Sequence, residues 1–119
     1  MNDRFKFRVW SNKENKMYKV HSLHIGTNKA IVTALYGNAS ITLDDKVLMQ
    51  STGLHDKNGK LIYELDYIKY KKETYKLNID KFLGITLTNI LNGDIIVMDD
   101  LILFDCEVIS NEFECNTKI

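Results

Sequence analysis

The chain has 119 residues, of which 45% are hydrophobic and 27% are charged, and its formal net charge is zero. This length and composition are those of one soluble globular domain that buries a core without disulfides or metals. No apolar run approaches the roughly 20 residues that a membrane-spanning helix needs, and the first ten residues lack the apolar stretch of a signal peptide. We therefore expect a protein that is neither inserted in a membrane nor exported.

The N-terminal segment, residues 4–10, predicts a half-buried strand, because its side chains alternate between two faces. Phe5, Phe7 and Val9 share one face, while three basic side chains and Trp10 share the other. A polar loop, residues 11–16, leads to a second strand that begins near Met17, so the two segments predict a β-hairpin. The apolar run at residues 30–36 has the length of a strand, and a short helix also fits it.

The central stretch, residues 46–71, predicts strands joined by turns. A strand at residues 46–50 is followed by a bend at residues 51–53 and by the dipeptide Asn58-Gly59. A two-residue loop of type I′ needs positive φ at both central positions, and Asn and Gly tolerate this conformation best. We therefore expect a type I′ hairpin at Asn58-Gly59, with a strand after it.

The C-terminal part, residues 72–119, predicts further short strands. Residues 74–79, 82–91 and 107–113 are strand candidates, Asn92-Gly93 is a turn, and residues 99–105 form either one helical turn or a loop. Many short strands with no long amphipathic helix favour a mainly β fold, as a small barrel or a sandwich with little helix.

The zero net charge conceals a gradient along the chain. Residues 1–29 carry seven Lys or Arg against two acidic residues, while residues 92–119 carry seven acidic residues against one Lys. The two ends can attract each other within a subunit or between subunits, and two separately solvated surfaces explain the charges equally well.

Metal, cofactor and disulfide chemistry are not predicted. His21 and His24 are three residues apart in a probable strand, where they face opposite ways, and His55 has no partner at a suitable spacing. Cys106 and Cys115 match no metal-knuckle spacing, and two free thiols suit a reducing cytosol. We therefore expect no metal and no cofactor.

Catalysis is not predicted either. Glu64 and Asp66 lie two residues apart on a probable strand, and paired carboxylates share acid and base roles when a cleft holds them. No nucleophile motif, phosphate-binding loop or dinucleotide fingerprint accompanies them. We interpret Asp66 as an acceptor of backbone hydrogen bonds where a strand begins, and we expect that the protein is not an enzyme.

Basic and aromatic residues interleave in residues 69–76, which suggests single-stranded nucleic acid as a ligand. The candidate contacts are Lys69, Lys71, Lys72 and Tyr75, with cations tracking phosphates and the ring stacking on a base. The zero net charge argues against a dedicated nucleic-acid binder, and lysines on exposed strands also discourage edge-to-edge aggregation.

The order of these motifs resembles that of the YopX family of phage and prophage proteins. Three positions depart from the family pattern: Ser51 replaces a Tyr, and Leu65 and Ser110 each replace a Gly. A positive-φ kink at Leu65 must therefore be absent or strained. The matching segments are FKFRVW (5–10), LMQ (48–50), TGL (52–54), DKNGK (56–60), IYE (62–64), Asp66 and EVI (107–109).

The resemblance implies a C-terminal half similar to an SH3-like barrel, preceded by a smaller β-rich part. The chain would then be a single unit, residues 1–119, with parts at about residues 1–52 and 53–119. The family is functionally uncharacterised, so the resemblance implies no activity. It does imply a phage or prophage protein in the cytoplasm of a bacterial host.

Our leading hypothesis is a non-enzymatic protein-interaction module that forms a homo-oligomer, with a host or phage protein as a further partner. An accessory nucleic-acid binder is the alternative. Head-to-tail contact between the two charged ends would join the subunits. The candidate contacts are Arg4, Lys6 and Arg8 against Asp99, Asp100 and Asp105.

Overall fold

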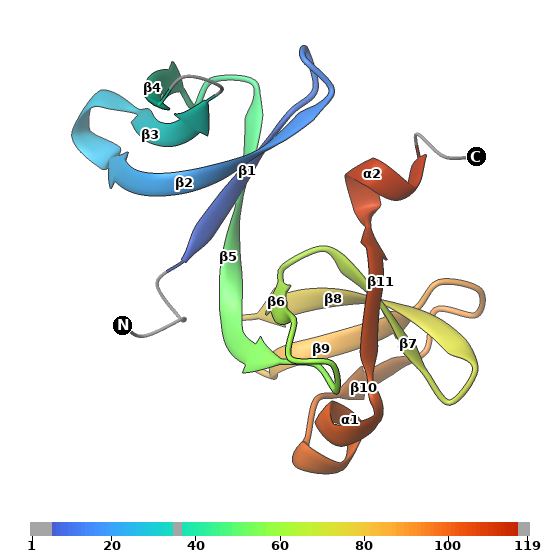
Figure 1. Ribbon diagram of the computed structural model, residues 1–119. Helices are drawn as coiled ribbons and strands as arrows, with labels where there is room; N and C mark the ends of the chain where they lie inside the picture. The colour runs from blue at the N-terminus through green and yellow to red at the C-terminus, as the bar shows by residue number, and fades with distance from the viewer. Residues whose placement is uncertain (1–5, 35–36, 117–119) are drawn as a thin grey trace.

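Two antiparallel sheets make up the protein in the computed structural model, which describes residues 6–34 and 37–116 (Figure 1). The first sheet has six strands in the spatial order β4-β3-β2-β1-β5-β6. Its strands are β1 (Phe7–Ser11), β2 (Lys16–His24), β3 (Lys29–Ala34), β4 (Gly37–Thr42), β5 (Lys46–His55) and β6 (Leu61–Tyr63). A 3-10 turn, η2 (Ile25–Thr27), lies between β2 and β3.

The second sheet has five strands in the order β10-β9-β8-β7-β11, and two short helices accompany it. Its strands are β7 (Asp66–Tyr70), β8 (Glu73–Asp80), β9 (Gly84–Asn89), β10 (Ile95–Val97) and β11 (Glu107–Asn111). Helix α1 (Asp100–Asp105) connects β10 to β11, and α2 (Glu112–Asn116) follows β11. The prediction of a mainly β protein with little helix is confirmed.

No closed barrel forms among the described strands. The second sheet ends at β10 on one side and at β11 on the other, and these two strands do not pair with each other. Helix α1 lies between β10 and β11 in the chain order. The last strand, β11, instead returns to pair with β7, the first strand of that sheet. The barrel closure that we predicted for the C-terminal half is therefore not found.

Strand β5 belongs to both parts of the molecule (Figure 1). Its first half pairs with β1, from Lys46 opposite Ser11 to Gln50 opposite Phe7. Its second half pairs with β6, with Ser51 opposite Tyr63 and His55 opposite Leu61. The register of the two strands shifts between these residue pairs. The predicted bend at residues 51–53 thus lies inside a strand, where Gly53 has a φ of 79°. The division at residues 52 and 53 falls within β5 and stays a prediction.

Each sheet has its own apolar core. The core of the first sheet contains Val9, as the period-two pattern of β1 predicted. The core of the second sheet also takes Ile62 from β6. The first core consists of Val9, Tyr18, Ala30 and Val32. The second consists of Ile62, Ile68, Tyr75, Leu77, Leu87, Ile102, Cys106 and Val108.

The turn at Asn58-Gly59 differs from the type I′ loop that we predicted. Only Gly59 has positive φ, at 82°, and its N–H donates to the carbonyl of Asp56 at 2.9 Å. The Asp56 carboxylate accepts hydrogen bonds from the N–H groups of Asn58 and Lys60, which stabilises a longer loop between β5 and β6. Positive φ at both central residues occurs instead at Lys71 and Lys72, between β7 and β8.

Local sequence patterns predicted the other elements with mixed success. The hairpin of β1 and β2 is confirmed, and residues 30–34 are strand. The helical alternative for residues 99–105 is correct, since residues 100–105 form α1. The Asp99 side chain caps this helix by accepting a hydrogen bond from the N–H of Ile102. Strand β4 was not predicted, and Glu112 and Phe113 lie in α2 rather than in the last strand.

Leu65 holds a left-handed backbone conformation, with a φ of 65°, in the turn between β6 and β7. Its N–H donates to the carbonyl of Leu77 at 2.8 Å, and its carbonyl accepts a hydrogen bond from the N–H of Glu112 at 2.9 Å. These two bonds hold the turn against β8 and α2. The kink is therefore present and strained, because a side chain at positive φ costs free energy that glycine avoids.

We expect Leu65→Gly to be more stable than Leu65→Ala by about 1 kcal/mol, because both variants lose the side chain but only Ala keeps the strain. At an ordinary position in a strand the order is the reverse. Chemical denaturation of the two variants measures the difference directly. An alanine variant that is as stable as the glycine variant would show that the φ of Leu65 imposes no strain.

Candidate functional site

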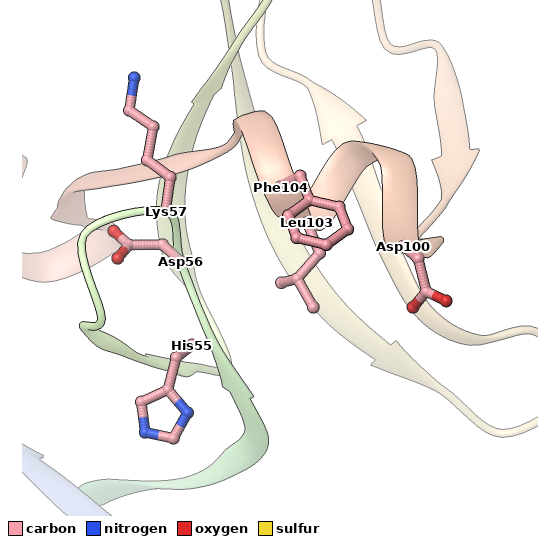
Figure 2. Close-up of a pocket in the computed structure, with 6 residues that line it drawn as sticks. All are labelled: His55, Asp56, Lys57, Asp100, Leu103 and Phe104. Carbon is pink, nitrogen blue, oxygen red and sulfur yellow. The ribbon is translucent and has the colours of Figure 1, made fainter.

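A cavity of 410 Å³ lies between α1 and the end of β5 (Figure 2). Its walls combine the apolar side chains of Leu103 and Phe104 with polar groups from both elements. A second cavity of 170 Å³ adjoins it, because Asp100 and Leu103 line both. The lining of the first cavity is His55, Asp56, Lys57, Asp100, Leu103 and Phe104.

Large apolar side chains are exposed on the elements that line these cavities. Five of them, in the β8–β9 turn, in β10 and in α1, have exposed fractions from 48% to 80%. Ile102, on the opposite side of α1, is buried in the second core. We name this region the α1–β10 surface and define it by Leu83, Ile95, Val97, Leu101 and Phe104.

The loop after β5 is fixed to β11 by the Asp56 carboxylate. One oxygen accepts hydrogen bonds from the N–H groups of Asn58 and Lys60, and the other accepts from the N–H of Val108 at 2.9 Å. Lys57 adds a bond from its N–H to the carbonyl of Cys106 at 3.1 Å. Burial alone would raise the pKa of Asp56, but the three amides outweigh it and hold that pKa below its usual value.

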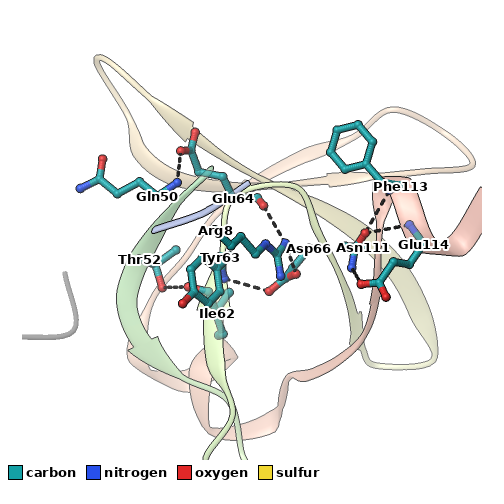
Figure 3. A network of polar contacts seen from close by, with 10 residues as sticks. All are labelled: Arg8, Gln50, Thr52, Ile62, Tyr63, Glu64, Asp66, Asn111, Phe113 and Glu114. Atoms are coloured by element: carbon teal, nitrogen blue, oxygen red, sulfur yellow. Dashed lines mark hydrogen bonds and ion pairs between the residues drawn. The ribbon is translucent and has the colours of Figure 1, made fainter. Parts of the chain in front are cut away.

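A buried ion pair joins the two sheets (Figure 3). Arg8 on β1 donates from Nη2 to Oδ1 of Asp66, the first residue of β7, at 2.7 Å. The other Asp66 oxygen accepts a hydrogen bond from the N–H of Tyr63 at 2.8 Å, and the guanidinium lies 4.6 Å from the centre of the Tyr63 ring. The Asp66 side chain is only 1% exposed and that of Arg8 14%. The Tyr63 bond confirms the role that we predicted for Asp66.

The two carboxylates that we considered for acid–base chemistry point to different partners. The Glu64 side chain accepts a hydrogen bond from the N–H of Gln50 on β5, whereas Asp66 binds Arg8 and Tyr63 (Figure 3). Burial raises the pKa of Asp66, and the Arg8 charge and the Tyr63 N–H oppose that increase. Both Asp66 oxygens are therefore occupied by contacts that hold the sheets together.

The structure brings the acidic oligomer contacts that we predicted together, but it does not do so for the basic ones. Asp99, Asp100 and Asp105 come together at α1, where they border the α1–β10 surface. Arg8 points inward and pairs with Asp66 in the same chain. Lys6 is exposed just before β1. Arg4 lies outside the described residues.

The predicted nucleic-acid contacts are only partly accessible. Lys69, Lys71 and Lys72 are exposed on β7 and in the turn after it. Tyr75 is buried in the second core, and its hydroxyl donates to Glu73 at 3.0 Å. Its ring therefore has no free face for a base to stack on.

The histidines and cysteines form no metal site in the part of the chain that the structure describes. The His21 ring contacts the hydroxyl of Thr33 at 2.7 Å, and His24 lies near Ser22. Cys106 is a free thiol in the second core, and burial raises its pKa. Among the described helices, none is long and apolar enough to cross a membrane.

Sequence reasoning missed the α1–β10 surface and the role of Asp56. Helix α1 has six residues, which is too short for helical periodicity to separate exposed Leu101 and Phe104 from buried Ile102. A signal for Asp56 was present, because Asp is favoured at the first position of a turn. Its bond to Val108, 52 residues away, had no such signal.

We expect Asp56→Asn to lower the free energy of unfolding by about 2 kcal/mol at neutral pH, because three amides lose an ionised acceptor. The pKa of Asp56 is lower in the folded state than in the unfolded state. Its contribution is therefore complete above a pH of about 4 and is lost as the pH falls through the folded pKa. Urea denaturation at neutral and at acid pH should show the two proteins converging in acid.

Asp80→Asn is the matched control. The Asp80 carboxylate also accepts hydrogen bonds from backbone N–H groups, those of Leu83 and Phe82, which lower its pKa. Asp80 is exposed, so water replaces these bonds and we expect a smaller loss than for Asp56→Asn. Equal losses at the two sites would contradict a special role for the Asp56 loop.

The fold has a counterpart among solved structures. The crystal structure of protein EF1440 from Enterococcus faecalis matches the chain with a TM-score of 0.68 at 24% sequence identity. The match covers 93% of this chain and 94% of that chain, and at this identity it shows the fold alone. Among proteins with curated descriptions, none matches the chain.

The family assignment rests on nearly the whole chain. The family model described as YopX protein matches residues 6–117, which include both sheets and both helices. The motifs quoted from the sequence supply Arg8, Asp56 and Asp66, the residues that fix the β5–β6 loop and join the sheets. The chain belongs to the YopX protein family.

Proposed function

We propose that the protein is a non-enzymatic protein-interaction module that self-associates through the α1–β10 surface. The observation that carries the proposal is the group of exposed apolar side chains around α1, among them Leu101 and Phe104. Monomeric soluble proteins rarely leave large apolar patches in contact with water, and such patches mark sites of association.

The composition of this surface supports contact with a protein. Protein interfaces combine apolar and aromatic side chains at their centre with a polar rim. Here Phe104 and Leu101 are flanked by Asp99, Asp100 and Asp105, which are exposed on or beside the same helix. The cavity next to Phe104 offers a recess for a side chain of the partner.

A non-enzymatic role is supported by the way the buried carboxylates are used. Asp56 and Asp66 are buried, and each binds backbone amides or Arg8 through both oxygens. An SH3-like character for the second sheet is part of the proposal. It is supported by the pairing of β11 with β7 after a helical turn, and SH3-like folds serve many binding roles.

The nucleic-acid alternative retains only one supporting observation. Lys69, Lys71 and Lys72 are exposed together, while Tyr75 is not available for stacking. Salt-sensitive retention on single-stranded nucleic acid, lost on replacing the three lysines, would favour this alternative over the interaction module.

Self-association predicts a molar mass above that of the 13.8 kDa chain in light scattering coupled to gel filtration. We expect Phe104→Glu to shift the protein to the monomer, because it puts a charge among apolar contacts. Its thermal stability should hardly change, since the side chain is 80% exposed.

Leu48→Glu is the control, because Leu48 is an exposed apolar residue of the first sheet, away from α1. We expect this variant to keep the mass of the unmodified protein. A monomer for the unmodified protein at every concentration would overturn the proposal, and so would an unchanged mass for Phe104→Glu.

A further inference from the structure

The two outer edges of the five-stranded sheet differ in how they are covered. At β11, the loop after β5 occupies the edge: the Asp56 carboxylate binds the N–H of Val108, and the Lys57 N–H binds the carbonyl of Cys106. At β10, no other strand of the described chain pairs with the edge. An uncovered edge is a template for another strand.

The hydrogen bonds between β9 and β10 show which backbone groups face outward. The N–H of Asn89 donates to the carbonyl of Asp94 at 2.8 Å, and the N–H of Met98 donates to the carbonyl of Ile85 at 2.9 Å. In an antiparallel pair these contacts recur at every second residue. Residues 94, 96 and 98 therefore face β9, and the N–H and carbonyl groups of Ile95 and Val97 face away from the sheet.

The β10 edge is short, but it lacks two other features that prevent strands from adding to an edge, namely charged side chains and proline. Its residues are Ile95, Ile96 and Val97, without a charge or a proline. Ile95 and Val97 are largely exposed on one face. The edge of the first sheet at β4 is different, because its exposed side chains are polar ones such as Asn38 and Thr42. Association through β10 buries apolar surface, whereas association through β4 would not.

We propose that a second copy of this chain pairs with β10 in antiparallel fashion across a two-fold axis, which joins the two five-stranded sheets into one. This inference rests on the proposed self-association and specifies its geometry. With Ile96 of the two copies on the axis, Ile95 of each copy lies opposite Val97 of the other. Their outward N–H and carbonyl groups then exchange four hydrogen bonds, and their exposed side chains form apolar cross-strand pairs.

The strand alone is too small for a stable interface. Three residues bury far less than the roughly 1,000 Å² that a specific interface needs, so neighbouring side chains must contribute. Leu83 lines the same cavity as Val97, and Leu101 and Phe104 are exposed on the helix that follows β10. These residues supply apolar area beside the paired strands.

Charge distinguishes this geometry from contact between the acidic and basic ends of the chain. Asp94 and Asp99 flank β10, and the two-fold pairing brings Asp94 of one copy near Met98 and Asp99 of the other. Salt screens this repulsion, so the dimer should persist or strengthen as ionic strength rises. A contact between oppositely charged ends would weaken under the same conditions.

Sedimentation equilibrium at low and high salt, with Ile95→Lys and Leu48→Lys, tests the proposal. Ile95→Lys places a charge at the edge and should weaken dimerisation by more than about 10-fold. Leu48 is an exposed apolar residue of the first sheet, so Leu48→Lys carries the same charge away from β10. It should remain a dimer. Hydrogen exchange should show the amides of Ile95 and Val97 protected in the dimer only.

The possible failures have different meanings. A dimer that Ile95→Lys leaves intact, or whose Ile95 and Val97 amides exchange freely, overturns the β10 geometry while self-association stands. A dimer that dissociates in high salt also overturns it and favours contact between the charged ends. A monomer under all conditions overturns this inference and the proposed function together.

Discussion

The ion pair between Arg8 and Asp66 is the contact on which the arrangement of the two sheets depends. Each sheet has its own apolar core, and of the buried residues in the second core only Ile62 comes from the first sheet. Besides the shared strand β5 and the bonds of the β5–β6 loop to Cys106 and Val108, the junction contains this pair and the stacked rings of Trp10 and Phe113, whose centres are 5.4 Å apart. A buried carboxylate without its cation is strongly destabilising, which makes the pairing specific.

The junction explains why distant sequence motifs occur together in this chain. Arg8 and Trp10 come from the first motif, Asp66 from the centre, and Phe113 from just after the last motif. The strained turn at Leu65 belongs to the same region, because its carbonyl binds the first residue of α2. The motif residues thus build a framework, and three of them, Leu54, Asp56 and Lys57, line the cavities beside the exposed α1–β10 surface.

The period-two pattern of residues 4–10 predicted β1, and short apolar runs between turn residues predicted most of the other strands, because both signals depend only on neighbouring residues. The kind of turn at Asn58-Gly59 was not predictable in this way, since the Asp56 carboxylate and its contact with Val108 decide it. Helix α1 was too short for a periodic signal. The inward direction of Arg8 depends on Asp66, 58 residues away, so its charge was wrongly assigned to the surface.

The most direct test of this account is a double-mutant cycle with Arg8→Met, Asp66→Asn and the combined variant, measured as free energies of unfolding in urea. Each single change should cost about 3 kcal/mol, because it leaves a buried group without its partner. The combined variant should lose clearly less than the sum, since no unpaired charge remains. Losses that add to within about 0.5 kcal/mol would contradict the pair as the link between the sheets.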